Sequence, residues 1–79
     1  MHSLATMKPG ETAVIDAIHE LDAPTQRLMS LGLVEGAIVE MAGRAIGGDP
    51  LEFRLFGCGI SLRREQAQKF LISPAARGG

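Results

Sequence analysis

Apolar and polar residues alternate over two neighbouring segments in the middle of the chain, residues 37–45 and 51–55. Such alternation is typical of strands that bury one face and expose the other. The run Gly47-Gly48-Asp49-Pro50 lies between them and predicts a turn, so the two strands are expected to form a hairpin. The predicted buried face consists of Ala37, Val39, Met41, Gly43, Leu51, Phe53 and Leu55.

Three further segments have the composition of short strands. Residues 11–18 are apolar at both odd and even positions, which predicts a strand that is covered on both sides. The alternation resumes briefly over residues 60–62, and a last apolar run occupies residues 70–72. Between these two strands, the composition of residues 64–69 favours one or two helical turns.

Residues 23–31 are predicted to form a helix. Asp22 suits the N-cap, where a carboxylate accepts hydrogen bonds from free N–H groups, and Pro24 loses nothing in the first turn. Leu28 and Leu31 lie three residues apart and form a stripe that is expected to pack against the rest of the protein.

A glycine ends this predicted helix. Gly32 fits the left-handed conformation with which many helices stop, and Leu33 is placed for a hydrophobic contact back to Leu28. Gly10 marks the turn before the first strand, Gly36 marks the turn after the helix, and Pro50 belongs to the turn of the hairpin.

Together these elements predict a mainly β protein with short helices. Five short strands with glycine-rich corners leave too little chain for two packed sheets, so we expect a small, strongly bent barrel with one helix after the first strand. Residues 1–73 are predicted to form this single domain. Residues 74–79 are predicted to be a flexible tail.

Composition narrows the class of protein. The chain has 79 residues, of which 46% are hydrophobic and 22% charged, as in a folded single domain. A net charge of -1 gives no overall attraction to nucleic acid or to an anionic membrane. No apolar run approaches the roughly 20 residues of a membrane span, and the single Cys58 fits a reducing compartment. We therefore expect a soluble, cytoplasmic protein.

Few side chains could carry chemistry. Catalysis by a nucleophile or an acid–base pair needs converging titratable groups, and the sequence offers no such set. His19 and Asp22 could ligate a transition metal weakly, with His2 or Cys58 as a further ligand or with the site shared between chains. A solvated loop histidine and a buried or half-buried cysteine are the simpler interpretations of His19 and Cys58.

Four arginines of the second half of the chain would form a basic patch if they lay side by side. They are Arg44, Arg54, Arg63 and Arg64. Glutamates at positions 40, 52 and 65 lie among them in sequence and should neutralise much of the positive charge. No nucleic-acid partner is therefore expected.

Four motifs occur in order along the chain: Lys8-Pro9-Gly10-Glu11, Arg27-Leu28-x-x-Leu31-Gly32-Leu33-x-x-Gly36, Gly48-Asp49-Pro50-Leu51 and Ile60-Ser61-Leu62-Arg63-x-x-x-Ala67. With them, residues 4–73 resemble the FeoA family of small cytoplasmic ferrous iron transport proteins. The chain departs from the family pattern at Val34-Glu35, where the family often places a proline before the second glycine. This difference bears on the turn rather than on the role.

The resemblance implies an SH3-like barrel and a non-catalytic accessory role in bacterial ferrous iron uptake. The implied partner is the cytoplasmic, GTPase-containing part of the FeoB-type membrane permease, whose assembly or activity the protein would modulate. No intrinsic cofactor and no insertion into the membrane are implied. Related domains occur at the C-terminus of iron-responsive repressors, so a metal-binding or metal-sensing domain is the alternative function.

Docking on such a partner requires an exposed surface, which we predict to be apolar and basic. Met29 falls outside the stripe of Leu28 and Leu31 and is expected to be exposed close to Arg27 and Leu33. The predicted partner-binding residues are Arg27, Met29, Leu33, Arg44, Arg54 and Arg63. The sequence leaves open whether the chain also forms a homo-oligomer.

Overall fold

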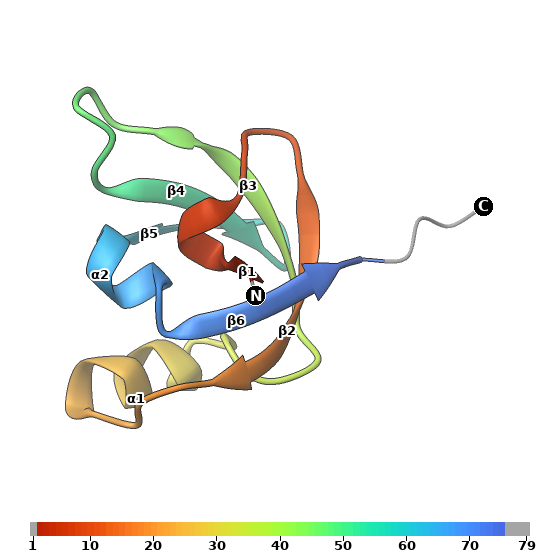
Figure 1. The fold of residues 1–79 in the computed structure, drawn as a ribbon, viewed down its shortest axis with the longest axis vertical. Coiled ribbons are helices and arrows are strands. Elements are labelled where there is room, and N and C mark those ends of the chain that lie inside the picture. The colour runs from red at the N-terminus through yellow and green to blue at the C-terminus, as the bar shows by residue number, and fades with distance from the viewer. Residues whose placement is uncertain (1, 76–79) are drawn as a thin grey trace.

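The computed structural model of the chain describes residues 2–75 (Figure 1). Six strands, one 3-10 helix and two α-helices follow one another along it. They are β1 (His2–Ser3), η1 (Leu4–Thr6), β2 (Thr12–Ile18), α1 (Ala23–Ser30), β3 (Ile38–Arg44), β4 (Leu51–Leu55), β5 (Cys58–Leu62), α2 (Arg64–Ala67) and β6 (Phe70–Pro74).

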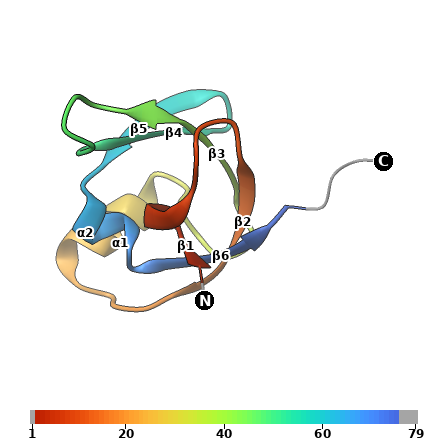
Figure 2. The same cartoon turned by 45° about the horizontal axis from the view of Figure 1, so that its top comes forward.

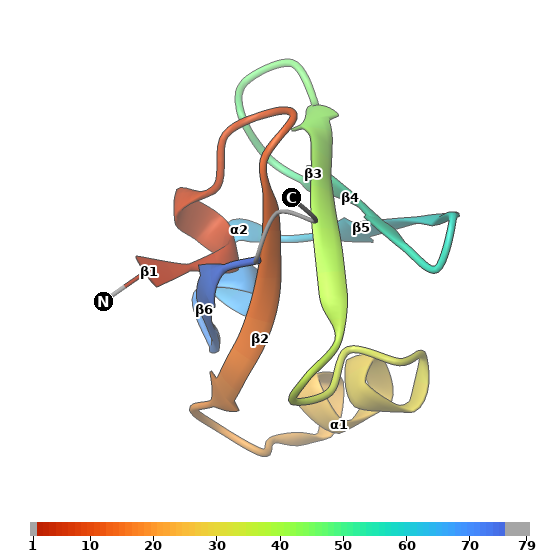
Figure 3. The same cartoon turned by 90° about the vertical axis from the view of Figure 1, so that its right-hand side faces the viewer.

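All six strands belong to one antiparallel sheet with the order β1-β6-β2-β3-β4-β5. The pairing shifts by one residue at Asp16 in β2 and at Ala42 in β3. Such bulges bend a strand and increase its twist, and the sheet accordingly curls so that β4 crosses behind β3 at a steep angle (Figure 3). Helix α2 links β5 to β6 on the open side of the curl (Figure 2).

The predicted fold class is confirmed, but the strand count was one too low. The missed strand, β1, has only two residues, and it pairs with β6 through His2 opposite Ile72 and Ser3 opposite Leu71. Two residues are too few to show an alternating pattern, so the sequence pattern could not predict this strand. It is defined by its pairing with the edge of β6.

Two other expectations fail on burial. Strand β2 is not covered on both sides, because Asp16 is exposed and Val14 is only half-buried while Ala13 and Ile15 face the core. Leu31 does not continue the buried stripe of the helix: it lies at the C-cap of α1 with 59% of its surface exposed.

The core fills the inside of the curled sheet. The alternating face predicted for residues 37–41 and 51–55 is buried, and Leu4, Ala5 and Met7 close one side of it from the 3-10 helix and its flank. The buried hydrophobic residues are Leu4, Ala5, Met7, Ala13, Ile15, Leu28, Leu33, Ala37, Val39, Met41, Leu51, Phe53, Leu55, Leu62, Ala67 and Phe70.

The end of the domain lies beyond residue 73. Pro74 still pairs with Ala13, and the Ala75 N–H donates to the Thr12 carbonyl at 3.3 Å. The predicted flexible tail therefore does not begin at residue 74, and its remainder, residues 76–79, lies outside the described residues. No helix within residues 2–75 is long and apolar enough to cross a membrane.

Candidate interaction surface

The loop that follows α1 is held by its backbone. Gly32 has a φ of +113°, its N–H donates to the Met29 carbonyl at 2.9 Å, and the Leu33 N–H donates to the Leu28 carbonyl at 3.3 Å. This is the predicted helix stop, in which the side chain after the glycine returns to the core. Leu33 is fully buried, so it cannot be part of an exposed docking surface.

The tight turn between β4 and β5 presents an aromatic side chain to solvent. Its two central residues, Phe56 and Gly57, have φ values of +54° and +79°, as in a type I′ hairpin turn. This conformation costs a non-glycine residue roughly 1–2 kcal/mol. Phe56 is nevertheless found there, with 78% of its surface exposed.

The Phe56 ring and the loop after α1 border a shallow apolar groove. A Cβ added to Gly32 would lie 3.0 Å from Phe56 Cε2, so the ring packs directly against this glycine. The groove is lined by Val34, Glu35, Gly36, Ala37, Ile38 and Phe56. Ile38 and Val34 are 57% and 40% exposed, which gives the groove three accessible apolar side chains. We call this surface the Phe56 groove.

The groove was missed by the sequence argument, which placed docking on Met29 and its neighbours. Met29 is half-buried and packs against the core instead of being free, whereas Arg27 is exposed on α1. A signal for Phe56 was available, since an aromatic residue stands before a glycine between two alternating segments. That pattern predicts only a turn. The curl of the sheet, which the pattern does not predict, brings this turn close to residues 34–38.

The predicted basic residues differ in the contacts that they make. Arg44 Nη2 donates to the Met7 carbonyl at 3.2 Å, and Arg64 donates to the carbonyls of Ala5 and Gly48 at 3.4 and 3.1 Å. Arg54 and Arg63 are exposed.

Acidic side chains alternate with these arginines. Arg54 stands opposite Glu40 in the pairing of β3 with β4, and the Glu52 carboxylate accepts from the Ser61 hydroxyl at 2.8 Å. The outer face of β4 is therefore of mixed charge.

The turn and cap residues have the following positions. Gly10 and Gly36 have positive φ values of +91° and +90°, and the Asp49–Pro50 peptide bond is cis. Sequence reasoning missed the role of Asp49, whose Oδ1 accepts from the Arg64 N–H at 2.9 Å and so caps α2 from the β3–β4 turn. Residues 15 positions apart make this contact, so no local pattern could have indicated it.

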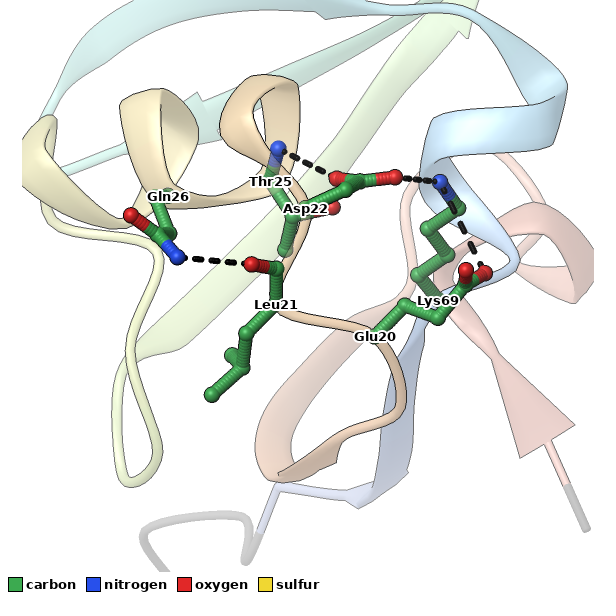
Figure 4. A network of polar contacts seen from close by, with 6 residues as sticks. All are labelled: Glu20, Leu21, Asp22, Thr25, Gln26 and Lys69. Atoms are coloured by element: carbon green, nitrogen blue, oxygen red, sulfur yellow. Dashed lines mark hydrogen bonds and ion pairs between the residues drawn. The ribbon is translucent and has the colours of Figure 1, made fainter.

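Asp22 links two elements (Figure 4). Its Oδ1 accepts from the Thr25 N–H at 2.9 Å, which caps α1, and its Oδ2 accepts from the Lys69 ammonium. The hydrogen bond from Lys69, together with those from Thr25, lowers the pKa of Asp22 from 3.8 to about 2. The same contact raises the pKa of Lys69, whose Nζ also lies 3.8 Å from Glu20 Oε1.

These contacts bear on the predicted metal ligands His19 and Asp22. Both carboxylate oxygens of Asp22 are already used, and His19 is tied to Lys69 only through its backbone N–H, at 2.7 Å from the Lys69 carbonyl. His2 and Cys58 lie in β1 and β5, at opposite ends of the strand order, and Cys58 is exposed instead of buried. Within residues 2–75, no three His, Cys, Asp or Glu side chains come together as metal ligands would.

Known proteins share both this sequence pattern and this fold. A family model described as the FeoA domain matches residues 2–74. The solution structure of an FeoA protein from Chlorobium tepidum has a TM-score of 0.87 at 32% identity and covers 95% of this chain and 71% of that chain. No curated protein matches the chain.

Two further structures define the fold class. FeoA of Stenotrophomonas maltophilia, complexed with zinc and described as a prokaryotic SH3 domain protein, has a TM-score of 0.81 at 26% identity over 92% of this chain and 91% of that chain. A manganese-dependent transcriptional repressor has a TM-score of 0.80 at 16% identity over 94% of this chain and 41% of that chain. The predicted SH3-like barrel is thus confirmed, and the repressor shares the fold alone.

Proposed function

The chain belongs to the FeoA family, and from this premise we propose that it is a non-catalytic accessory protein of ferrous iron uptake. It docks through the Phe56 groove on the cytoplasmic, GTPase-containing part of a FeoB-type permease and modulates the assembly or activity of that permease. Family and fold support the role in ferrous iron transport. The Stenotrophomonas relative is itself described as a candidate activating factor of such transport.

A single observation carries the docking site: Phe56 is both strained and exposed. A φ of +54° raises the conformational free energy of an aromatic residue. Because 78% of the Phe56 surface is exposed, burial of the side chain contributes little stability in return. Residues in such conformations cluster at functional sites, where binding rather than stability accounts for them. An aromatic side chain beside Val34 and Ile38 is the kind of anchor that dominates protein interfaces.

The size of the groove predicts a weak and reversible contact. A few apolar side chains on a turn and a loop cannot supply the 1,200–2,000 Å² or so that stable complexes bury. Regulation of a permease suits such an interface, because the accessory protein can leave as readily as it binds.

The test is a titration of the purified chain into the cytoplasmic part of the FeoB-type permease, followed by calorimetry. Phe56→Asn should weaken binding about tenfold or more, because truncating an interface anchor costs about 2 kcal/mol. Ile46→Asn is the matched control: Ile46 is fully exposed in the β3–β4 loop, at the opposite end of β3 from Ile38. Equal binding by wild type and Phe56→Asn would remove the groove from consideration, and no binding by wild type would refute the proposed partner.

A metal-responsive domain is the second candidate function. The zinc complex of the Stenotrophomonas protein favours it, and so does the fold shared with the manganese-dependent repressor. It ranks second because residues 2–75 assemble no ligand cluster. Titration of the metal-free chain with Zn(II) and Fe(II) separates the two candidates: heat or dimerisation on adding metal supports metal binding, and neither is expected for a pure docking module.

A further inference from the structure

Strand β5 leaves one edge of the sheet open. The two-residue turn at Phe56 and Gly57 makes Leu55 and Cys58 a hydrogen-bonded pair, and the pairing alternates from there along the hairpin. The N–H and C=O groups of Gly59 and Ser61 consequently point away from β4. No loop, cap or side-chain hydrogen bond within residues 2–75 uses them.

This edge lacks the features that usually prevent pairing with another chain. Sheet edges are commonly blunted by charged residues, prolines or bulges. Strand β5 reads Cys-Gly-Ile-Ser-Leu and pairs with β4 without a register shift, and Gly59 and Ser61 are both exposed. The opposite edge, β1, has only two residues and offers little template.

The open edge is complementary to itself. If two copies of β5 lie antiparallel about a two-fold axis at Ile60, Gly59 of each copy stands opposite Ser61 of the other. Both residues have outward-facing backbone groups, so they exchange hydrogen bonds in each direction as a ladder pair. The half-buried Ile60 side chains then meet at the axis and cover apolar surface that solvent now reaches.

Charge complementarity supports the same register. Arg54 stands opposite Gly59, and Glu52 stands opposite Ser61. In the paired sheet, one row of residues about 14 Å long crosses both copies. It consists of Arg54 and Gly59 of one copy, followed by Ser61 and Glu52 of the second copy. The short Ser61 side chain lies between the two charges and already donates to Glu52 of its own copy. An extended Arg54 side chain can reach past it toward that carboxylate, once on each side of the axis.

We propose that two copies of the chain associate through their β5 edges, antiparallel and centred on Ile60, to form one continuous sheet. This self-association goes beyond the docking function and does not depend on it. The pairing uses residues 58–62, whereas the Phe56 groove is lined by residues 34–38 and Phe56, so the two surfaces share no residue.

Cross-linking tests the register. In the pairing proposed, the two Ile60 Cα atoms lie about 4.5 Å apart, within the range that a disulfide bridges. Ile60→Cys in a Cys58→Ser background should therefore give a disulfide-linked dimer on mild oxidation. The same background with Ser61→Cys is the control, since residue 61 faces Gly59 and not its own copy. Absence of the Ile60→Cys dimer, or equal cross-linking by the control, overturns the proposal.

Sedimentation velocity tests the edge itself. Gly59→Pro removes an outward N–H without breaking a bond to β4, and it should weaken dimerisation about tenfold or more. Gly59→Ala is the matched control, because a Cβ at this position has nothing within 4 Å and the N–H remains. A wild-type chain that stays monomeric, or a Gly59→Pro chain that dimerises like Gly59→Ala, refutes the pairing.

A charge variant keeps the test decisive if Gly59→Pro does not fold. Arg54→Gln should weaken dimerisation about fivefold through the loss of two exposed ion pairs. Arg27→Gln removes the same charge from α1 and should leave dimerisation unchanged. Equal effects of the two variants would show that the row of Arg54 and Glu52 does not form.

Discussion

Gly32 lies against the ring of Phe56, at a point where an added side chain would be crowded. A Cβ on Gly32 would be 3.0 Å from Phe56 Cε2 and 3.2 Å from Leu55 Cδ2. The same glycine has a φ of +113° at the end of α1. It therefore has two roles: it ends the helix, and it lets the β4–β5 turn approach closely enough to form the Phe56 groove.

Gly32→Ala should destabilise the protein more than Gly36→Ala does. Both glycines have positive φ, so each substitution costs about 1 kcal/mol in conformation, but a Cβ on Gly36 meets nothing within 4 Å. The crowding at Gly32 should add about 1 kcal/mol or more. Chemical denaturation of both variants measures the difference, and equal losses would mean that the Phe56 ring moves aside without cost.

Phe56→Asn should increase stability by about 0.5–1 kcal/mol while it weakens docking about tenfold or more. Asn-Gly is the preferred pair for a type I′ turn, and Asn tolerates positive φ far better than Phe. Thermal or urea unfolding measures the stability of this variant, and the titration described above measures its binding. Higher stability together with weaker binding would show that Phe56 lowers stability in favour of docking. A loss of stability would instead show that the contact between the ring and Gly32 outweighs the backbone strain.

Leu33→Ala should cost about 2–5 kcal/mol and can unfold so small a domain, whereas Leu31→Ala should change stability by about 0.5 kcal/mol or less. Leu33 is fully buried and Leu31 is 59% exposed, although the two residues are separated by a single glycine. Denaturant midpoints of the two variants provide the comparison. Similar losses would imply that Leu31 packs more closely in solution than its exposure indicates.

Acid should remove the contribution of Asp22 to stability. Its pKa is about 2 in the folded protein and near 3.8 without its partners, so the folded state holds the charged form more tightly. This contribution is fully present above the higher value and is lost as the pH falls through the range between the two. Lys69 stays protonated throughout this range, so the change follows the Asp22 carboxylate alone.

Asp22→Asn isolates this effect, since Asn still caps α1 but cannot hold the Lys69 ammonium. The wild type should be more stable than this variant at neutral pH, and the difference should shrink between about pH 4 and pH 2. Glu35→Gln is the control, because Glu35 is an exposed carboxylate on the loop after α1. A constant difference across the acid range would show that Lys69 does not stabilise the charged form.

The sequence by itself determined the elements and the fold class. Alternation over residues 37–41 and 51–55 predicted the buried faces correctly, because a strand has a fixed period of two and one face must leave water. The cap at Asp22 and the helix stop at Gly32 could also be predicted from the sequence, since both provide hydrogen bonds to backbone groups within one helical turn. The motifs around them identified the family.

Only the tertiary structure decided which residues share a surface. The curl of the sheet brings the turn at Phe56 to the loop after α1, places Lys69 on the free oxygen of Asp22, and turns Leu33 inward while Leu31 stays out. These relationships join residues that are distant in sequence, or they separate neighbours by a single change of backbone direction. They depend on where bulges and positive φ angles redirect the chain in space, and a pattern of apolar and polar residues does not specify those changes of direction.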